Sequence, residues 1–354
     1  MAGGNWTPTE SKVRPGLYIN FVSAAVAQIQ GGARGVVAIA LKNYGANVSA
    51  KEFHLIESEK QAVDLFGADN IKSIKLALQG GAKEVLVYTL PVIDGTTVTE
   101  DTAYTEAFDE LDTRPFNVFV FDGEVADAAQ DKALTWAIRN KSEGKHFMVV
   151  FGGNATADLD PAVGNARSIR LAEEYAVNLI NGVILNGEPL SSAQFSPYIA
   201  GLIAGTPINK SITYAQIRVD DVTKRMTNAQ IKEALTKGSL VLVHDGEKVK
   251  IERGICTDKK KIRTIRARQA ISTDITKTAA DSYIGKIDNN VDGQKALISA
   301  IKAYLERLAV ANVVTNEIVV DLDPNFESIG DKVYLFIKVT EVDSMEEIYL
   351  TIQV

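Results

Sequence analysis

The sequence predicts a chain of mixed α/β and α+β class, with an α/β centre and extended arms at both ends. Through the middle of the chain, segments with helical spacing of apolar residues alternate with short apolar runs, which is the pattern of a parallel α/β unit. After about residue 245 the alternation stops, and two helical segments and two strand-like runs follow. The 354 residues exceed one ordinary hydrophobic core, so several packed units are expected.

Residues 1–22 are expected to form an extended N-terminal arm that ends in a strand. Glycines and prolines without any period occupy residues 1–16, and alternation typical of a strand with two usable faces follows at 17–22. A small N-terminal α/β domain is predicted over residues 23–100. Its expected elements are strands at 35–41 and 84–90 and helices at 58–66 and 70–79.

The central α/β domain is predicted over residues 101–245. Strands are expected at 116–121, 146–151 and 239–244, and helices at 125–141, 165–181 and 193–204. A loop at 182–189 separates the last two helices.

A C-terminal domain is predicted over residues 246–331, with a helical segment near 272–283 and a stronger helix at 292–311. On the stronger helix one face is apolar, whereas the opposite face carries Lys295, Lys302 and other polar residues. Residues 332–354 are expected to form a hairpin and a terminal strand, because alternating runs at 332–342 and 346–354 flank a short polar turn.

Composition narrows the function classes. Hydrophobic residues make up 46% of the chain and charged residues 23%, which is typical of a globular protein. A formal net charge of -7 argues against nucleic acid as a partner. The sequence has no apolar run long enough to span a bilayer and no signal peptide at its start, so synthesis in the cytoplasm and no insertion into a membrane are expected.

The sequence contains no recognisable motif for catalysis or for cofactor binding. The sequence has no phosphate-binding glycine loop, no nucleophile elbow and no zinc-protease helix. His54, His146 and His244 stand apart, and a structural role is favoured for each over a catalytic one. Cys256 is the only cysteine and is expected to be a buried small apolar residue. No catalytic residue, cofactor or metal is therefore predicted.

Two charged features remain to be explained. The Asp-Leu-Asp-Pro patterns at 158–161 and 321–324 could offer oxygens to calcium, but Asp before Pro is common in turns that cap helices, and this second interpretation is favoured. From Lys248 to Arg268 nine basic residues stand against two acidic ones. Their alternation with apolar residues is typical of strands with one solvated face, and a docking surface for an acidic partner is equally possible.

Four segments resemble the phage tail sheath family. The stretch Ser196–Tyr214, SPYIAGLIAGTPINKSITY, is similar to the signature of that family. RPGLYINF at 14–21, GEKVKIERGI at 246–255, and YIGK at 283–286 with the helix and loop at 292–314 are also similar and occur in the same order. The resemblance covers most of the chain and implies a subtilisin-like topology for the central domain. The protease residues of that fold are missing.

The resemblance implies a structural subunit, not an enzyme, that polymerises helically around a tail tube and contracts to drive the tube through a target cell envelope. Implied partners are other copies in stacked hexameric rings, the tail tube protein, and the baseplate and tail-terminator proteins. The implied location is the cytoplasm of the producing bacterium and then the tail of a phage or phage-tail-like bacteriocin.

Exchange of terminal strands between subunits would hold such a polymer together while its pitch changes. The expected exchange residues lie in the two terminal strands: Leu17, Tyr18, Ile19, Phe21, Ile348, Tyr349, Leu350, Ile352 and Val354. The residues expected to face the tube are basic: Lys295, Lys302, Lys259, Lys260 and Lys261.

Three other functions remain open at this stage. The chain could be an α/β hydrolase-like enzyme with scattered site residues, which a pocket with perturbed titrating groups would favour. It could be another structural component of a phage tail, although the α/β centre argues against a tube protein. It could also be the sheath of a bacterial secretion system, although that role is usually split between two chains.

Overall fold

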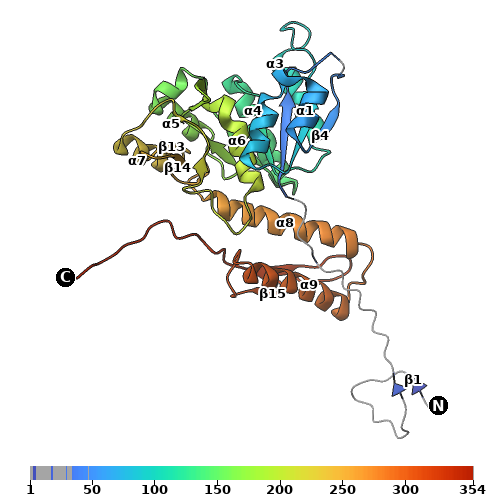
Figure 1. Ribbon diagram of the computed structural model, residues 1–354. Helices are drawn as coiled ribbons and strands as arrows, with labels where there is room; N and C mark the ends of the chain where they lie inside the picture. Colours follow the sequence, from blue (N-terminus) through green and yellow to red (C-terminus); the bar gives the residue numbers. More distant parts are fainter. Residues whose placement is uncertain (1–2, 5–16, 19–28, 30–33, 47, 354) are drawn as a thin grey trace.

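The computed structural model describes residues 3, 4, 17, 18, 29, 34–46 and 48–353 (Figure 1). Two packed units and a C-terminal tail can be distinguished. We call residues 34–261 the sheet unit, 262–342 the C-terminal unit and 343–353 the C-terminal arm. A pair of two-residue strands, β1 (Gly3–Gly4) and β2 (Leu17–Tyr18), precedes the sheet unit.

A six-stranded sheet with the strand order β4-β5-β3-β6-β7-β8 forms the centre of the sheet unit. Five strands are parallel and the edge strand β4 is antiparallel. The strands are β3 (Val36–Leu41), β4 (Phe53–Ile56), β5 (Glu84–Thr89), β6 (Val118–Phe121), β7 (Met148–Phe151) and β8 (Ala176–Asn178). Their short apolar sequences are those expected of strands buried on both faces.

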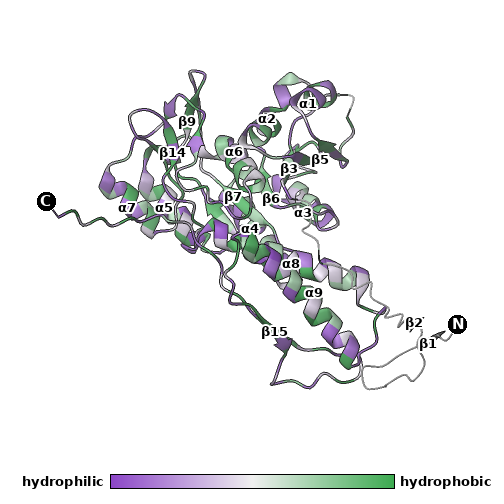
Figure 2. Cartoon of the chain, turned by 60° about the horizontal axis from the view of Figure 1, so that its bottom comes forward, coloured by the Kyte–Doolittle hydropathy of each residue, from purple (hydrophilic) through white to green (hydrophobic). Residues whose placement is uncertain are grey.

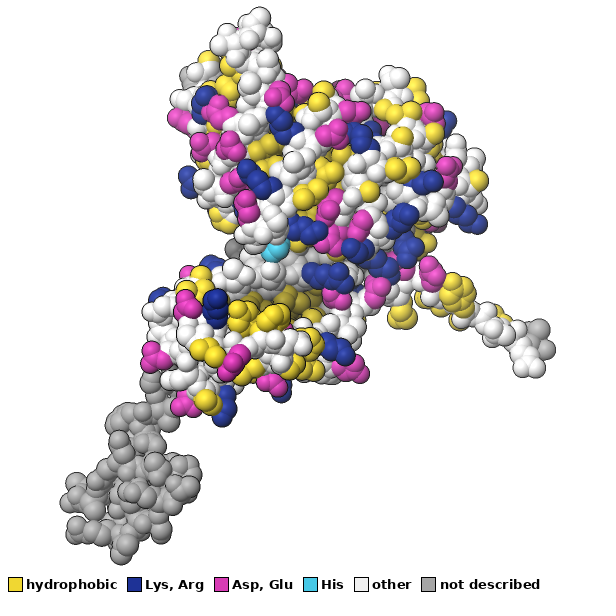
Figure 3. Space-filling view, turned by 180° about the vertical axis from the view of Figure 1, so that it is seen from behind, with side chains coloured by type: hydrophobic (Ala, Val, Ile, Leu, Met, Phe, Trp, Pro, Cys, Tyr) yellow, Lys and Arg dark blue, Asp and Glu magenta, His cyan; other side chains and the backbone are white. Residues whose placement is uncertain are grey.

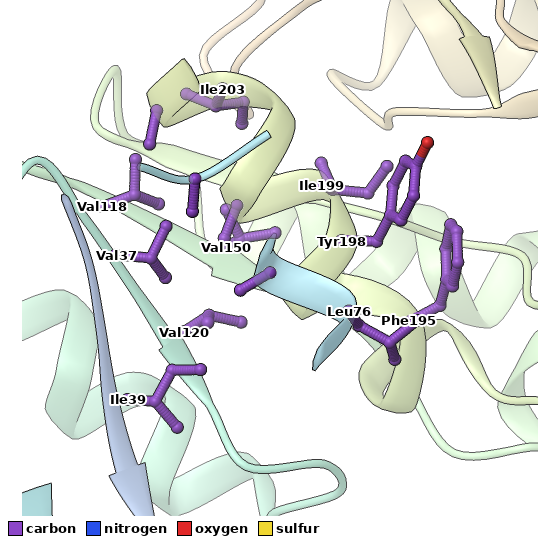
Figure 4. Packing of buried hydrophobic residues seen from close by; sticks show 14 of the residues in the cluster. Val37, Ile39, Leu76, Val118, Val120, Val150, Phe195, Tyr198, Ile199 and Ile203 are labelled. Carbon is purple, nitrogen blue, oxygen red and sulfur yellow. The ribbon is translucent and has the colours of Figure 1, made fainter. Parts of the chain in front are cut away.

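Helices cover both faces of this sheet. On one face lie α1 (Glu59–Phe66), α2 (Lys72–Gly80) and α6 (Ser192–Gly205), and on the other α3 (Glu100–Leu111) and α4 (Asp127–Ser142). Alternation along β3 serves both layers, because Val37 and Ile39 contact the first face and Ala38 and Ala40 the second. Figure 4 shows Ile199 and Ile203 of α6 above the valines of the central strands.

Close packing of α6 on α2 explains the small residues of α6. A Cβ added at Gly201 would lie 2.0 Å from the carbonyl oxygen of Ala77, and one at Gly205 would lie 1.9 Å from that of Gly81. Gly80 on the facing helix has the same constraint, with the carbonyl oxygen of Tyr198 at 2.1 Å. Glycine is therefore required at all three positions for the two backbones to approach this closely.

Two small sheets and two helices complete the sheet unit around β8. The small sheets have the orders β10-β9-β12 and β11-β14-β13. Their strands are β9 (Val183–Leu185), β10 (Glu188–Leu190), β11 (Gln216–Ile217), β12 (Asp221–Val222), β13 (Leu242–His244) and β14 (Val249–Ile251). The remaining elements are α5 (Pro161–Arg170), α7 (Asn228–Thr236) and the short 3-10 helices η1 (Ala68–Asn70) and η2 (Ala157–Leu159).

The C-terminal unit consists of two long helices and a two-stranded sheet. Helix α8 (Ile262–Ser282) lies beside α9 (Val291–Val310), and the antiparallel strands β15 (Val319–Leu322) and β16 (Leu335–Lys338) pack on α9 (Figures 1 and 2). Ile262 and Ile265 at the start of α8 belong to the core of the sheet unit, whereas Ile271 and Ile275 contact that of the C-terminal unit. One continuous helix therefore ties the two units together.

The structure confirms the mixed α/β class and corrects several predicted elements. The domain boundary predicted after residue 100 separates strands of one sheet, because β3 hydrogen-bonds to β5 on one side and β6 on the other. The helix predicted at 165–181 ends at Arg170, since residues 176–178 pair with β7. The second half of the basic stretch is the start of α8, not a strand.

The C-terminal hairpin also differs from the prediction. The run at 332–342 contributes β16, but its partner is β15, which precedes it in the chain. Residues 346–353 form neither helix nor strand, and beyond Glu347 the chain leaves the body and meets no strand of its own subunit (Figure 1).

Candidate subunit-docking surfaces

The C-terminal arm exposes a row of large apolar side chains to solvent. The exposed fractions are 90% for Met345, 70% for Ile348, 87% for Tyr349, 81% for Leu350 and 79% for Ile352. Figure 3 shows the arm projecting from the body with hydrophobic side chains along it. An apolar segment of this kind gains free energy by docking, so the arm is a candidate binding element.

The sheet β15–β16 has two unpaired edges within the described residues and an exposed face on which apolar and charged side chains mix. Val320 and Ile337 face the helices, whereas Val319 and Phe336 on the other face are 45% and 44% exposed. The N–H and C=O groups along an unpaired edge can accept a further strand. The C-terminal unit therefore carries both an acceptor for a strand and, next to it in sequence, a segment that could supply one.

The predicted exchange residues are distributed unevenly in the structure. Leu17 and Tyr18 form β2, which pairs in parallel with β1, so this part of the predicted N-terminal strand exists. Ile19 and Phe21, as well as Val354, lie outside the described residues. The described C-terminal members, Ile348, Tyr349, Leu350 and Ile352, lie in the exposed arm, in a segment without regular secondary structure.

The lysines predicted to face the tube separate into two groups. Lys295 and Lys302 lie on the exposed side of α9, where neither forms an ion pair within the described part of the chain. Lys260 lies 2.7 Å from Glu174 and 2.9 Å from Asp258, and Lys261 lies 2.7 Å from Asp343. The charges of these two lysines are therefore compensated by carboxylates of the same subunit, and only Lys259 of that cluster remains exposed and unpaired among the described contacts.

Much of the basic stretch at 248–268 holds parts of the same chain together. Besides the two paired lysines, Arg268 forms an ion pair with Glu341 at 2.5 Å, and Arg263 donates to the carbonyl oxygen of Asn312 at 3.0 Å. Arg266 donates to the carbonyl oxygen of Thr206 at 2.5 Å. The acidic partner that the sequence left open is thus in part the chain's own C-terminal region.

The histidines and the cysteine occupy structural positions. Burial raises the pKa of the Cys256 thiol well above its usual range, so the reactive thiolate is disfavoured. His54 packs edge-on against Phe66, and His244 accepts from the backbone N–H of Gly246. Among the described residues no cluster of His, Cys, Asp and Glu could hold a metal ion.

His146 joins the two units. One ring nitrogen lies 2.8 Å from the hydroxyl of Ser272 on α8, and the other lies 2.9 Å from that of Tyr175. Burial, followed by the charge of Lys141, lowers the pKa of His146, which favours the neutral ring. A hydrolase with Ser272 as its nucleophile would need backbone N–H groups near this serine to stabilise an oxyanion. Ser272 lies inside α8, where the backbone N–H groups are already bonded within the helix, so no such pair is available. This arrangement supports a structural bridge.

A cavity of about 510 Å³ lies beside this bridge, between the amino ends of the parallel strands and α8. Among its charged lining residues, Arg34 pairs with Asp274, which also accepts from the hydroxyl of Tyr304 at 2.5 Å. Ligands of open α/β sheets bind at the carboxyl ends of the strands, which is the opposite edge. The position of the cavity therefore does not favour the hydrolase alternative.

The acidic pattern at 158–161 has a structural role at the carboxyl ends of β7 and β8. Asp160 caps α5 by accepting from the N–H of Ala162, as expected for Asp before Pro. Asp158 is buried and accepts from the N–H and the hydroxyl of Ser192 at 2.5 and 2.6 Å. Burial raises the pKa of Asp158 to about 6, so at neutral pH its carboxylate is mostly ionised and fixes the start of α6.

None of the helices in the described ranges combines the length and apolar character that crossing a membrane requires. Three described surfaces are candidates for docking: the apolar arm, the open sheet of the C-terminal unit and the exposed polar face of α9.

Comparisons with known proteins agree with this arrangement. The chain is 27% identical over 339 residues to the tail sheath protein of Clostridium phage phiCD119, covering 93% of this chain and 88% of that protein. The fold resembles the crystal structure of a sheath tail protein from Desulfitobacterium hafniense, with a TM-score of 0.75, 22% identity, and coverage of 95% of this chain and 99% of that one. It also resembles the helical sheath of the anti-feeding prophage in its contracted state, with a TM-score of 0.73, 17% identity, and coverage of 97% and 99%.

Two family models match adjacent parts of the chain. The phage tail sheath protein central domain matches residues 98–257, and the phage tail sheath C-terminal domain matches residues 257–354. Together they span residues 98–354, which include β6, β7 and β8 of the central sheet, the C-terminal unit and the arm. The chain belongs to the phage tail sheath protein family.

Proposed function

We propose that the chain is the subunit of a contractile tail sheath, which polymerises helically around a tail tube and shortens to drive the tube through a target cell envelope. Membership of the tail sheath family supports this role. One structural neighbour is a helical sheath in the contracted state, and another belongs to the sheath complex of an extracellular contractile injection system. Contraction of a sheath requires identical subunits that stay joined while the helical array changes shape.

The observation that carries the proposal is the exposed apolar arm beside an open two-stranded sheet. The arm pairs with no strand of its own subunit in the described structure and its apolar side chains are exposed, so we propose that a second copy covers them. Such a contact is heterologous, since the donor and acceptor surfaces differ, and repeated heterologous contacts build rings or helices. Ile348, Leu350 and Ile352 would supply one face of the added strand.

The N-terminal arm is proposed to serve the same exchange. The alternation in sequence of the segment that contains Leu17, Tyr18, Ile19 and Phe21 supports a strand there, and so does the pairing of Leu17 and Tyr18 with β1 of the same chain. Main-chain hydrogen bonds between such strands persist when the bodies rotate, because the linkers absorb the motion. Two arms per subunit would connect each copy to more than one neighbour.

The tube-facing surface is proposed to be the exposed polar side of α9, on which Lys295 and Lys302 lie near Asp292 and Glu306. Lys295 and Lys302 are separated by two helical turns and therefore lie on the same side of the helix. Contacts between solvated charges are weak and screened by salt, which suits a surface that must release the tube during contraction. The baseplate and tail-terminator proteins are proposed partners at the two ends of the array.

Electron microscopy of the purified chain tests this function. The full chain is expected to form hollow striated tubes, and a variant that ends at Glu347 is expected to remain monomeric because it lacks the apolar part of the arm. A full chain that stays monomeric under all assembly conditions, including in the presence of tail tubes, would contradict the proposal. Tubes formed equally well by the truncated variant would contradict the role of the arm.

A further inference from the structure

Glu346 has a buried side chain in an otherwise exposed segment. Its side chain is only 7% exposed, whereas Met345 before it is 90% exposed and Ile348 after it is 70% exposed. A carboxylate loses its hydration on burial, so it is retained only where charged or hydrogen-bonding groups replace the water. The arm thus contains one residue that is built into the body.

Both carboxylate oxygens of Glu346 are bonded by the body. One oxygen accepts from the hydroxyl of Thr213 at 2.9 Å, and the other lies 3.1 Å from Nε of Arg253 and 3.2 Å from Nζ of Lys261. Ser344 adds a hydroxyl at 3.2 Å. Burial raises the pKa of Glu346, but the bonds from Thr213 and Lys261 outweigh it, and the net pKa lies below the usual range. The site is therefore built for an ionised carboxylate.

The groups that bind Glu346 come from two segments that are distant in sequence. Thr213 lies in the stretch 196–214 and Arg253 in the stretch 246–255, which are the two central segments that resemble the sheath family. The backbone N–H of Gly254 donates to the hydroxyl of Thr213 at 3.0 Å, which leaves the proton of that hydroxyl for Glu346. A Cβ at Gly254 would lie 2.7 Å from Ile212, so glycine is needed for the two segments to meet.

The contacts of the arm with the body stop immediately after this site. Lys261 also binds Asp343 at 2.7 Å, and Glu347 lies 3.9 Å from Arg253 with its side chain 61% exposed. Beyond Glu347, the described residues 348–353 make no side-chain hydrogen bond or ion pair with the body. The part of the arm that is bound to the body therefore ends at residues 346–347, and the part without such contacts begins at residue 348.

We infer that Thr213, Arg253 and Lys261 form a receptor for the Glu346 carboxylate that anchors the root of the C-terminal arm to the sheet unit. Residues 343–346 then move with the sheet unit as one body, and the flexible arm begins at Glu347. The anchor sets the point and direction from which the apolar strand leaves the subunit. Its consequence for assembly, which rests on the proposed function, is that the anchor selects the neighbour that receives the arm.

The mobility of spin labels attached to the full-length chain shows whether the root of the arm is anchored to the body. The native Cys256 is buried, so a cysteine introduced at an exposed position is labelled selectively. Labels at Met345→Cys and Leu350→Cys report on the root and on the free arm, respectively. In monomer isolated by size exclusion, the label at residue 345 is expected to move several-fold more slowly than the label at residue 350.

Substitutions on the arm and on the body test whether the contact of Glu346, and not any change of charge in this region, restricts the label at residue 345. Glu346→Ala and Lys261→Met are expected to bring the mobility at residue 345 to that at residue 350. Glu347→Ala, which removes the exposed neighbouring carboxylate, is the matched control and is expected to change neither label. Equal mobility of the two labels in the parent chain, or no change on Glu346→Ala, would overturn the inference.

Assembly of the same variants tests the consequence for the polymer. Glu346→Ala is expected to give fewer tubes or tubes without a regular helical repeat, whereas Glu347→Ala assembles normally. Regular tubes from Glu346→Ala with a mobile root would overturn the neighbour-selecting role. If the labels behave as expected and no variant, including the parent, forms tubes, the anchor stands and the proposed function fails.

Discussion

At the scale of single residues, the structure explains why two glycines and a threonine occur in the stretch that resembles the sheath family. Gly201 and Gly205 allow α6 to approach α2, and Thr213 contributes its hydroxyl to the site of Glu346. Each of these roles depends on a partner far away in sequence, namely Ala77, Gly81 and Glu346. A sequence can show that such a stretch is unusual, but the partner that gives each residue its role appears only in the folded chain.

Replacement of Gly201 by alanine is expected to destabilise the sheet unit by about 3 kcal/mol, because the added methyl group overlaps a backbone carbonyl that cannot move alone. Chemical denaturation measures the free energy of unfolding. Gly45→Ala is the control, since its Cβ would meet its nearest neighbour at 3.4 Å. Equal stability of the two variants would show that the helices can separate at little cost.

Replacement of Asp158 by asparagine is expected to lower the free energy of unfolding at pH 7 by about 2 kcal/mol, because an amide cannot accept from both donors of Ser192. Asp160→Asn on the same turn is the control, since asparagine caps a helix as well as aspartate. Thermal unfolding of both variants measures the difference. An unchanged Asp158→Asn variant would contradict the structural role of this carboxylate.

At the scale of elements, periodicity in the sequence predicts most of the helices correctly and is weakest where tertiary pairing decides. Helices α4, α6 and α9 lie close to their predicted ranges, because each is long and has a buried apolar face. Helix α3 was not predicted, although the apolar spacing of its Ala103, Tyr104, Ala107, Phe108 and Leu111 and the capping threonine before it carry a helical signal. The helix expected at 165–181 was wrong because pairing with β7 converts its end into β8.

The predicted docking elements differ in how much the sequence reveals. Alternation correctly marks the arm as apolar, but it predicts a strand where the single subunit has none. Charge counts along the basic stretch do not reveal that Lys260 and Lys261 pair with carboxylates of the same subunit. Glu346 was missed altogether. Its signal, a single carboxylate between exposed neighbours, becomes informative only once Thr213 and Arg253 are known to be adjacent.

Substitution of Ile348 and Leu350 by aspartate is expected to abolish polymer formation, because it removes the apolar face of the arm and adds two charges to the interface. Sedimentation of assembled material measures the loss, which should exceed tenfold. Leu159→Asp, which adds a charge at a 62% exposed apolar residue of the sheet unit, is the control. Normal sedimentation of the double variant would refute docking by the arm.

Reversal of charge at Lys295 and Lys302 is expected to weaken assembly on isolated tail tubes at low salt, with little effect on folding, because both side chains are exposed. Co-sedimentation with tubes measures the binding. Reversal at Lys232 and Lys237, two exposed lysines at α7, is the control of equal charge change. Undiminished tube binding by the α9 variant would remove this face from the proposed tube surface.

At the scale of the whole molecule, the chain combines a rigid centre with an element that is incomplete alone. The six-stranded sheet, covered on both faces, and α8, which is shared by the two units, fix the place from which the arm departs. The arm and the open two-stranded sheet each lack a partner within the described subunit. This division between a rigid body and an unsatisfied strand is what a polymer needs if its subunits are to rotate without separating.

The most direct test of strand exchange is amide hydrogen exchange of the arm in the monomer and in the assembled sheath. The account predicts that the amides of residues 348–352 exchange rapidly in the monomer and become protected on assembly, together with one edge of the sheet β15–β16. Rapid exchange of these amides in fully assembled sheath, while other surfaces become protected, would contradict the central claim that the arm joins one subunit to the next.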